Sequence, residues 1–258
     1  MSLEDRSDSD VTFGKNPGEW IPVQPPTFGQ VGIKLGFGTF RNNVSLASAG
    51  NLTASSSLYP SIGLFGEIWL NPTWIIRGDI FQGIATTSNP RSGSSPSEIN
   101  NQISKYAIAV GHNFLLHDDF FGPKLQLRGG ISSYRAYADA STPLAFTTVS
   151  YSGLVLGVLG TLPVTKDKRW SLGAGLNMTF MTKLSESPGS SGSGAENSIT
   201  DFNVYGEHRI RPNLNVIAGM DFSLYSTSFS GGTRPDGDTA STLSQRHTVL
   251  NAGIAYLF

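Results

Sequence analysis

Apolar and polar residues alternate with a period of two over most of the chain. In the clearest segment, Trp170 to Thr182, every second residue from Trp170 to Phe180 is apolar and those between are small or polar. Because successive side chains of a β-strand point to opposite faces, this pattern predicts a strand with one apolar and one polar face. Similar segments begin at Phe28 and recur as Tyr59 to Leu70, Trp74 to Ala85, Ile103 to Phe114, Lys124 to Ala138, Val149 to Leu162, Ile199 to Ile210, Leu214 to Phe229 and Thr248 to Phe258.

Short turns alternate with long polar connections between these segments. The turns include Asn71-Pro72-Thr73 and Arg211-Pro212-Asn213, whereas the long connections include residues 86–101 and 185–197. Bacterial membrane barrels have this asymmetry, with short periplasmic turns and long extracellular loops. The sequence therefore predicts an all-β fold, a closed antiparallel up-and-down transmembrane β-barrel of about ten strands, with eight or twelve as alternatives.

The composition supports a wall that faces lipid on one side. Only 14% of residues are charged and 38% are hydrophobic, and no apolar run reaches the length of about 18 residues that a membrane helix needs. A transmembrane barrel fits both values because its strands alternate between lipid and lumen. The competing fold is a soluble β-sandwich, which the same alternation also serves. A net charge of -1 gives no basic surface for nucleic acid, and the lack of cysteine excludes disulfides and thiolate metal sites.

The last segment, Thr248 to Phe258, resembles the closing strand of bacterial outer-membrane β-barrels. It ends on Phe258, with Tyr256 two positions earlier and apolar residues at every second position before that. Through this signal and the strand pattern, residues 28–258 resemble the broad superfamily that includes OmpA-, OmpW- and opacity-type barrels. The resemblance implies insertion in the bacterial outer membrane, contact with its lipid, and recognition of the terminal strand by the barrel-assembly machinery.

Residues 1–27 form a separate, polar and proline-rich segment. Proline cannot donate to a sheet ladder, so we expect an extended periplasmic tail. It is either a loose terminus or an arm that binds the barrel mouth or a periplasmic partner. Met1 to Asp10 lacks the features of a signal peptide, and because a barrel needs export we expect that the signal peptide has been removed.

Charged residues within the predicted strands share the parity opposite to the apolar set. A charge on the lipid face costs roughly 2 to 4 kcal/mol near the midplane, so the pattern predicts that these side chains face the lumen. Five cations and five anions would pair into a plug, whereas inward glycines such as Gly36 and Gly173 leave room for a narrow channel. The predicted lumen network consists of Lys34, Glu67, Arg77, Asp79, Lys105, Arg128, Asp201, Glu207, Arg209 and Asp221.

Aromatic residues gather near the predicted strand ends. Amphipathic rings are enriched where a membrane meets water, so this placement predicts interfacial girdles. The residues assigned to the membrane interface at the short-turn end are Trp69, Trp74, Trp170, Tyr256 and Phe258.

Candidate catalytic residues are sparse. His247 is expected near the outer rim and follows Asp236 and Asp238, which allows a rim hydrolase comparable to omptin-like proteases or lipid A acylhydrolases, although no family motif is matched. His117-Asp118-Asp119 is either a cation site or a solvated turn. We expect no enzyme, metal or cofactor.

The leading hypothesis is a barrel with a largely plugged lumen that presents extracellular loops for adhesion or interaction, and the alternative is a narrow or gated channel for small solutes.

Overall fold

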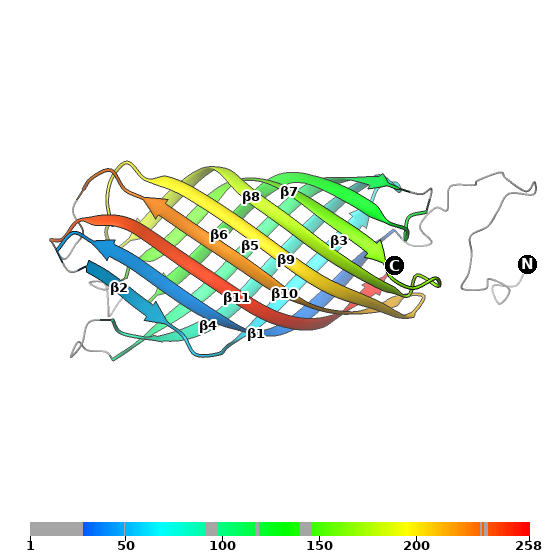
Figure 1. The fold of residues 1–258 in the computed structure, drawn as a ribbon, viewed down its shortest axis with the longest axis horizontal. Coiled ribbons are helices and arrows are strands. Elements are labelled where there is room, and N and C mark those ends of the chain that lie inside the picture. The colour runs from blue at the N-terminus through cyan, green and yellow to red at the C-terminus, as the bar shows by residue number, and fades with distance from the viewer. Residues whose placement is uncertain are drawn as a thin grey trace, which may run out of the picture.

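The fold is an antiparallel β-barrel closed on itself, seen in a computed structural model (Figure 1). The structure describes residues 28–48, 50–90, 97–116, 119–139, 146–232, 234 and 237–258. The predicted tail, residues 1–27, lies outside the described residues, as do His117, Asp118 and Asp236. Among the residues described, no helix is long and apolar enough to cross a membrane.

In the described part of the chain, eleven strands occupy ten positions around the barrel. The β2 and β3 strands share one position, since residues 50–55 of β2 pair with 41–46 of β1, and residues 59–68 of β3 pair with 29–38. Pairing of β1 with β11 closes the wall, so the predicted up-and-down barrel of about ten strands is confirmed. The strands are β1 (Gly29–Leu46), β2 (Gly50–Ser55), β3 (Tyr59–Trp69), β4 (Trp74–Ser88), β5 (Glu98–Leu115), β6 (Lys124–Ala138), β7 (Thr148–Pro163), β8 (Trp170–Ser187), β9 (Glu196–Arg211), β10 (Leu214–Ser228) and β11 (Ala240–Leu257).

The strands are longer than their sequence pattern predicts. The expected connection 86–101 is shorter than predicted, because β4 continues to Ser88 and β5 begins at Glu98. Likewise, β8 continues to Ser187 and β9 begins at Glu196, which shortens the expected connection 185–197. All these additions lie at the end of the barrel with the long connections, which we call the outer end.

The reason for the missed strand ends is an inversion of polarity along each strand. In the first half of β1 the exposed side chains are apolar, as at Leu35 and Phe37, and the inward positions carry Lys34 and glycine. In the second half, Phe40 and Val44 are buried, while the outward positions hold Thr39, Arg41 and Asn43. The first half thus suits a wall bathed in hydrocarbon, and the second half suits a wall bathed in water.

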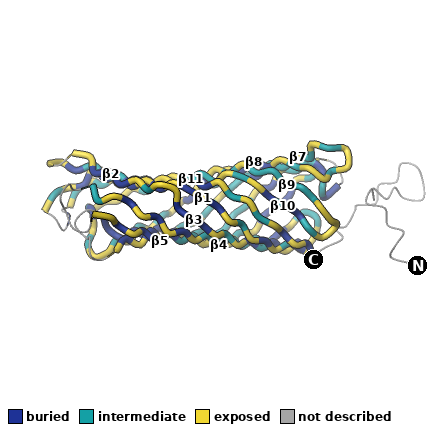
Figure 2. The backbone as a smooth tube through the Cα atoms, turned by 90° about the horizontal axis from the view of Figure 1, so that it is seen from below, coloured by how far each residue is buried: buried dark blue, intermediate teal, exposed yellow. Residues whose placement is uncertain are grey.

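Beyond the apolar band the barrel has an apolar interior. We call this part the outer extension; it comprises residues 39–46, 50–59, 85–88, 98–104, 133–138, 148–152, 182–187, 196–200, 225–228 and 240–249. Figure 2 shows buried and exposed positions alternating along its strands. Its interior, which we call the outer core, is a cluster of buried side chains that includes Phe40, Val44, Ile99, Ile103, Tyr134, Val149, Tyr151, Tyr225 and Leu243.

The polarity inversion predicts unequal effects of the same substitution at two points of β11. Ile254 faces outward in the apolar band and Thr242 faces outward in the outer extension; both are exposed. Ile254→Lys is expected to destabilise the folded barrel by about 2 to 4 kcal/mol, because it places a charge in hydrocarbon. Thr242→Lys is expected to change the stability by less than about 0.5 kcal/mol. Equilibrium unfolding by urea in lipid vesicles measures both, and equal losses would contradict the assigned membrane position.

Candidate functional site in the lumen

The short-turn end of the barrel is filled by an inner plug, made of Trp69, Ile75, Phe120, Phe121 and Leu257. The connection between β5 and β6 supplies both phenylalanines, and Phe120 is only 1% exposed. Its ring contacts the Trp69 ring with the centroids 4.7 Å apart. The described part of this connection, residues 119–123, therefore folds under the barrel and fills its end.

Charged side chains hold the inner plug in place. Asp119, which is buried, accepts a hydrogen bond from the backbone N of Phe121 at 3.0 Å and forms an ion pair with Lys168 from the turn between β7 and β8. The Lys124 ammonium lies 4.3 Å from the centre of the Phe120 ring, and the Arg209 guanidinium lies 3.8 Å from that of Phe121. These contacts join several wall positions to the plug, since cations bind favourably over aromatic faces.

Trp69 does not lie at the membrane interface, which corrects the prediction for this residue. Its side chain is 6% exposed, and its Nε1 donates to the carboxylate of Glu67 at 2.5 Å. Trp69 has the same parity as Glu67, so both point inward. The other four aromatic residues of this group, Trp74, Trp170, Tyr256 and Phe258, are each about half exposed.

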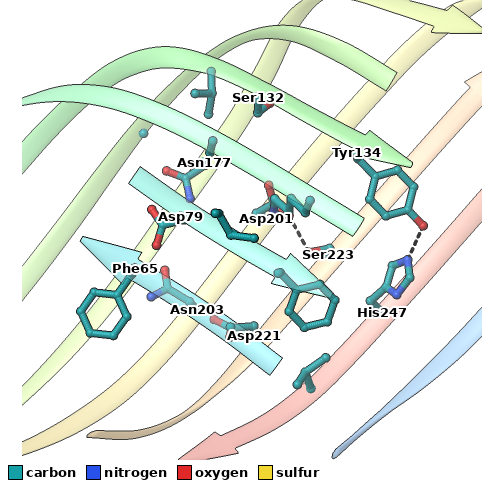
Figure 3. Close-up of a pocket in the computed structure, with 18 of the residues that line it drawn as sticks. Phe65, Asp79, Ser132, Tyr134, Asn177, Asp201, Asn203, Asp221, Ser223 and His247 are labelled. Carbon is teal, nitrogen blue, oxygen red and sulfur yellow. Dashed lines mark hydrogen bonds and ion pairs between the residues drawn. The ribbon is translucent and has the colours of Figure 1, made fainter. Parts of the chain in front are cut away.

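Above the inner plug lies a charged cavity of about 210 Å³ (Figure 3). This volume has room for several water molecules. Seven of the ten residues of the predicted lumen network line it: Lys34, Arg77, Asp79, Lys105, Arg128, Asp201 and Asp221. The remaining three, Glu67, Glu207 and Arg209, do not line this cavity.

Two sets of ion pairs line this cavity. The Arg77 guanidinium donates to both oxygens of Asp79, at 2.9 and 2.8 Å, and lies 3.4 Å from an oxygen of Glu67. The Lys105 ammonium lies 2.5 Å from Asp201, which also accepts a hydrogen bond from the Ser223 hydroxyl at 2.5 Å. Burial strengthens each attraction but also makes each unpaired charge costly, so these groups stabilise the barrel only as pairs.

The other charges of the network have mixed partners. Asp221 accepts from the Asn251 amide at 2.6 Å, Glu207 accepts from the Asn215 amide, and the Lys34 ammonium lies 5.5 Å from the centre of the Phe65 ring. The Nε of Arg128 is buried without a hydrogen-bond partner among the described residues. The network is thus a set of local pairs and side-chain contacts around a small cavity.

Tyr134, Tyr225 and His247 form the upper boundary of the cavity, and Figure 3 shows Tyr134 beside His247. The Tyr134 hydroxyl lies 2.5 Å from Nε2 of His247 and donates to Gln245 at 2.9 Å, while the Tyr59 hydroxyl lies 3.4 Å from Nδ1. If Tyr134 donates to Gln245, it accepts from Nε2 and leaves Nδ1 to accept from Tyr59. The rings of Tyr134 and Tyr225 stack with their centroids 3.8 Å apart.

His247 is therefore a buried residue with aromatic neighbours. It is 4% exposed, its ring stacks on Phe40, and no carboxylate hydrogen-bonds to it among the residues that the structure describes. Asp238, which lies near His247 in the sequence, accepts a hydrogen bond from the Ser48 hydroxyl at 2.5 Å. In the described part of the chain, no group of three His, Asp or Glu side chains has the geometry of a metal site.

Solved structures place the fold among bacterial outer-membrane β-barrels. The outer-membrane protease OmpT of Escherichia coli matches with a TM-score of 0.56 and 14% identity, over 98% of this chain and 100% of that one. The translocator domain of NalP from Neisseria meningitidis gives 0.45 and 11%, over 89% of each chain, and Ail of Yersinia pestis gives 0.33 and 12%, over 88% and 99%. No protein-family model and no curated protein matches the sequence.

The pairing of Lys105 with Asp201 predicts a difference between single and double substitutions. Lys105→Met is expected to destabilise the barrel by about 3 kcal/mol, because Asp201 remains as a buried charge without its partner. In Lys105→Met/Asp201→Asn most of this loss should be recovered, since the amide still accepts from Ser223 without carrying charge. Urea unfolding of the variants measures the difference, and a double variant less stable than the single one would contradict the pairing.

Proposed function

We propose that this outer-membrane barrel neither conducts solutes nor catalyses a reaction, and that it presents its outer extension and connecting loops for adhesion or interaction. The observation that carries the proposal is the outer core. Its buried side chains occupy the lumen above the charged cavity, where a channel would need a continuous polar path.

The closed state of the lumen is supported at two levels. At the short-turn end, Trp69 and Phe120 pack together with Ile75 and Leu257. At the outer end, Tyr59, Tyr134, Tyr151 and Tyr225 are each at most 4% exposed. The charged cavity therefore lies between two apolar barriers.

A role in display is supported by the construction of the outer extension. Its strands remain hydrogen-bonded well beyond the apolar band, as in the pairing of β4 with β5 up to Ser88 and Glu98. A packed interior keeps such a wall rigid, while its outward face carries mainly hydroxyl and amide side chains. Rigid presentation lowers the entropy that a partner must overcome on binding.

A hydrolase is the less supported alternative, although the OmpT structure is that of a protease. At 14% identity that likeness concerns the fold alone. The proposed absence of catalysis is supported by His247, whose hydrogen-bond neighbours are tyrosines. A general base would need to reach a substrate or nucleophile from this position, which is 4% exposed.

The channel alternative is supported by the cavity of about 210 Å³ and can be tested by conductance. In planar lipid bilayers the unmodified barrel is expected to show no sustained openings. Substituting Trp69→Ala/Phe120→Ala opens only the inner plug, and Tyr134→Ala/Tyr225→Ala opens only the outer core, so each double variant should stay silent. The quadruple variant should give discrete openings, because the two barriers act in series.

Sustained openings of the unmodified protein would reject the closed lumen. The quadruple variant must keep the far-ultraviolet circular dichroism of a β-barrel, so that openings are not attributed to unfolded chains. If only one of the double variants shows openings, the barrier removed in that variant closes the lumen by itself. The barrier that this variant keeps is then not needed for closure.

The display hypothesis predicts that binding depends on the tips of the outer end. The tip between β8 and β9, residues 188–195, can be replaced by a glycine-serine segment of equal length while both strands are kept. Cells carrying the unmodified barrel are expected to adhere to immobilised matrix proteins or to one another, and cells carrying the replaced tip should adhere several-fold less. The control replaces residues 165–167 at the short-turn end and keeps Lys168, whose ion pair with Asp119 holds the inner plug. Equal adhesion by all strains, at equal barrel levels, would contradict the proposal.

Two predicted partners remain predictions. Recognition of the terminal strand by the assembly machinery is consistent with the exposed rings of Tyr256 and Phe258. A periplasmic partner for residues 1–27 concerns a segment outside the described residues.

A further inference from the structure

Outward-facing cations recur at one point of four described strands, where the apolar band ends. Along the outward parity, an apolar side chain is followed by a hydroxyl residue and then by a cation on β1, β6 and β11; on β8 the cation comes soon after the last apolar side chains. These series are Phe37, Thr39 and Arg41; Ile131, Ser133 and Arg135; Leu250, Thr248 and Arg246; and Phe180, Met181 and Lys183. All four cations are exposed, and their position places them at the level of the lipid head groups.

Two of these cations lie directly opposite each other. Arg41 of β1 and Arg246 of β11 are partners in the register that closes the barrel. Side chains at opposed positions of an antiparallel pair start only about 5 Å apart at their Cβ atoms, and like charges there repel. Within the described residues, neither arginine forms an ion pair with the protein.

Each guanidinium is nevertheless held by a neighbour. The Arg246 guanidinium lies 4.8 Å from the centre of the Phe222 ring, and Nε of Arg41 donates to the Asn43 side chain at 3.2 Å. These contacts orient the two groups and leave their remaining N–H donors available. A fixed pair of like charges without an anion suits a ligand that carries negative charge.

The surrounding charges favour an anion at this level. On the described strands, the outward acids Glu98 and Glu196 lie at the first residue of β5 and β9, at the tip of the outer extension. Planar guanidinium groups bind phosphate oxygens in pairs, with a geometry that lysine cannot reproduce. An outer-membrane lipid that carries phosphate has its acyl chains beside Phe37 and Leu250 when its head group lies beside the arginines.

We propose that Arg41 and Arg246 together bind a phosphate group of an outer-leaflet lipid, across the strand pair that closes the barrel. The bound anion removes the repulsion between the two arginines and links β1 to β11 on the outside of the wall. Arg135 and Lys183 add positive charge at the same level on the opposite strands.

The test measures lipid binding by the full chain folded in micelles of an uncharged detergent. The probe is lipid A with two phosphates, and native mass spectrometry gives the fraction of barrel that carries it. Arg41→Gln/Arg246→Gln should bind roughly 30-fold more weakly, as expected for the loss of two basic groups at a membrane surface. The control Lys166→Gln/Arg211→Gln removes the same charge from exposed positions at the short-turn end and should bind like the unmodified protein.

Three further measurements make the outcome decisive. Arg41→Lys/Arg246→Lys keeps both charges without the planar guanidinium groups, so it should bind lipid A with intermediate strength. This variant replaces the glutamine variant in the test if the glutamine variant fails to fold. Dephosphorylated lipid A should bind the unmodified barrel no more tightly than intact lipid A binds the glutamine variant. Millimolar inorganic phosphate, at constant ionic strength, should not displace lipid A.

Unchanged binding by folded Arg41→Gln/Arg246→Gln overturns the proposal, and so does equal weakening in the control, which would indicate attraction by net charge alone. Equal binding of dephosphorylated lipid A shows that the acyl chains suffice and rejects the phosphate contact. Displacement by inorganic phosphate assigns the arginines to a free anion and rejects the lipid.

Discussion

The structure depends on one constraint: the solvent outside the wall changes along each strand, whereas the alternation of side chains between the two faces does not. In the apolar band the hydrophobic effect places large apolar side chains outward, as at Leu35, and leaves the inward face to glycine and charge. Above the band, water bathes the outer face and the apolar side chains must turn inward, as at Phe40 and Val44. One continuous strand thus belongs to a membrane barrel at one end and to a water-soluble barrel at the other. The outer core is the direct result, since a closed wall with an inward apolar face encloses its own hydrophobic interior.

This inversion also explains why the charges of the lumen lie where they do. Ionised groups cannot face hydrocarbon, and they gain nothing from the apolar outer core, so seven of the ten predicted lumen charges line the cavity between the inner plug and the outer core. There the wall is lined with glycine, and a bulky residue such as Phe65 can lie across the lumen under Lys34 and Arg77. The ion pairs of Arg77 and Lys105 are then less an added source of stability than the condition under which buried charges are tolerated.

Much of the fold was predictable because each membrane-level strand repeats the same local pattern. The closing strand, the strand count and the inward parity of the charges all follow from residues close together in sequence. The outer strand ends were not predictable by the same rule, because the apolar residues change parity there; Ile99 and Ile103 fall among asparagine and glutamine, which favour a loop by composition. Trp69 was placed by its distance from a turn, although its shared parity with Glu67 already pointed inward. The contact of Tyr134 with His247 joins residues 113 positions apart, and no local spacing reveals it.

The same constraint decides which surfaces of the barrel are exposed. A lumen filled with aromatic side chains at both ends leaves the barrel two kinds of accessible surface: the tips and outward face of the outer extension, and the ring where that face meets lipid. The first is rich in hydroxyl groups and carries the acids Glu98 and Glu196, and the second carries exposed arginine and lysine. Residues on that ring are under no pressure from folding to be basic, because serine or threonine satisfies the water-facing position equally well on neighbouring strands. Arginine at opposed positions of the closing strand pair carries a repulsion that folding alone does not require. Such a pair is therefore better explained by what binds outside the wall than by the stability of the wall itself.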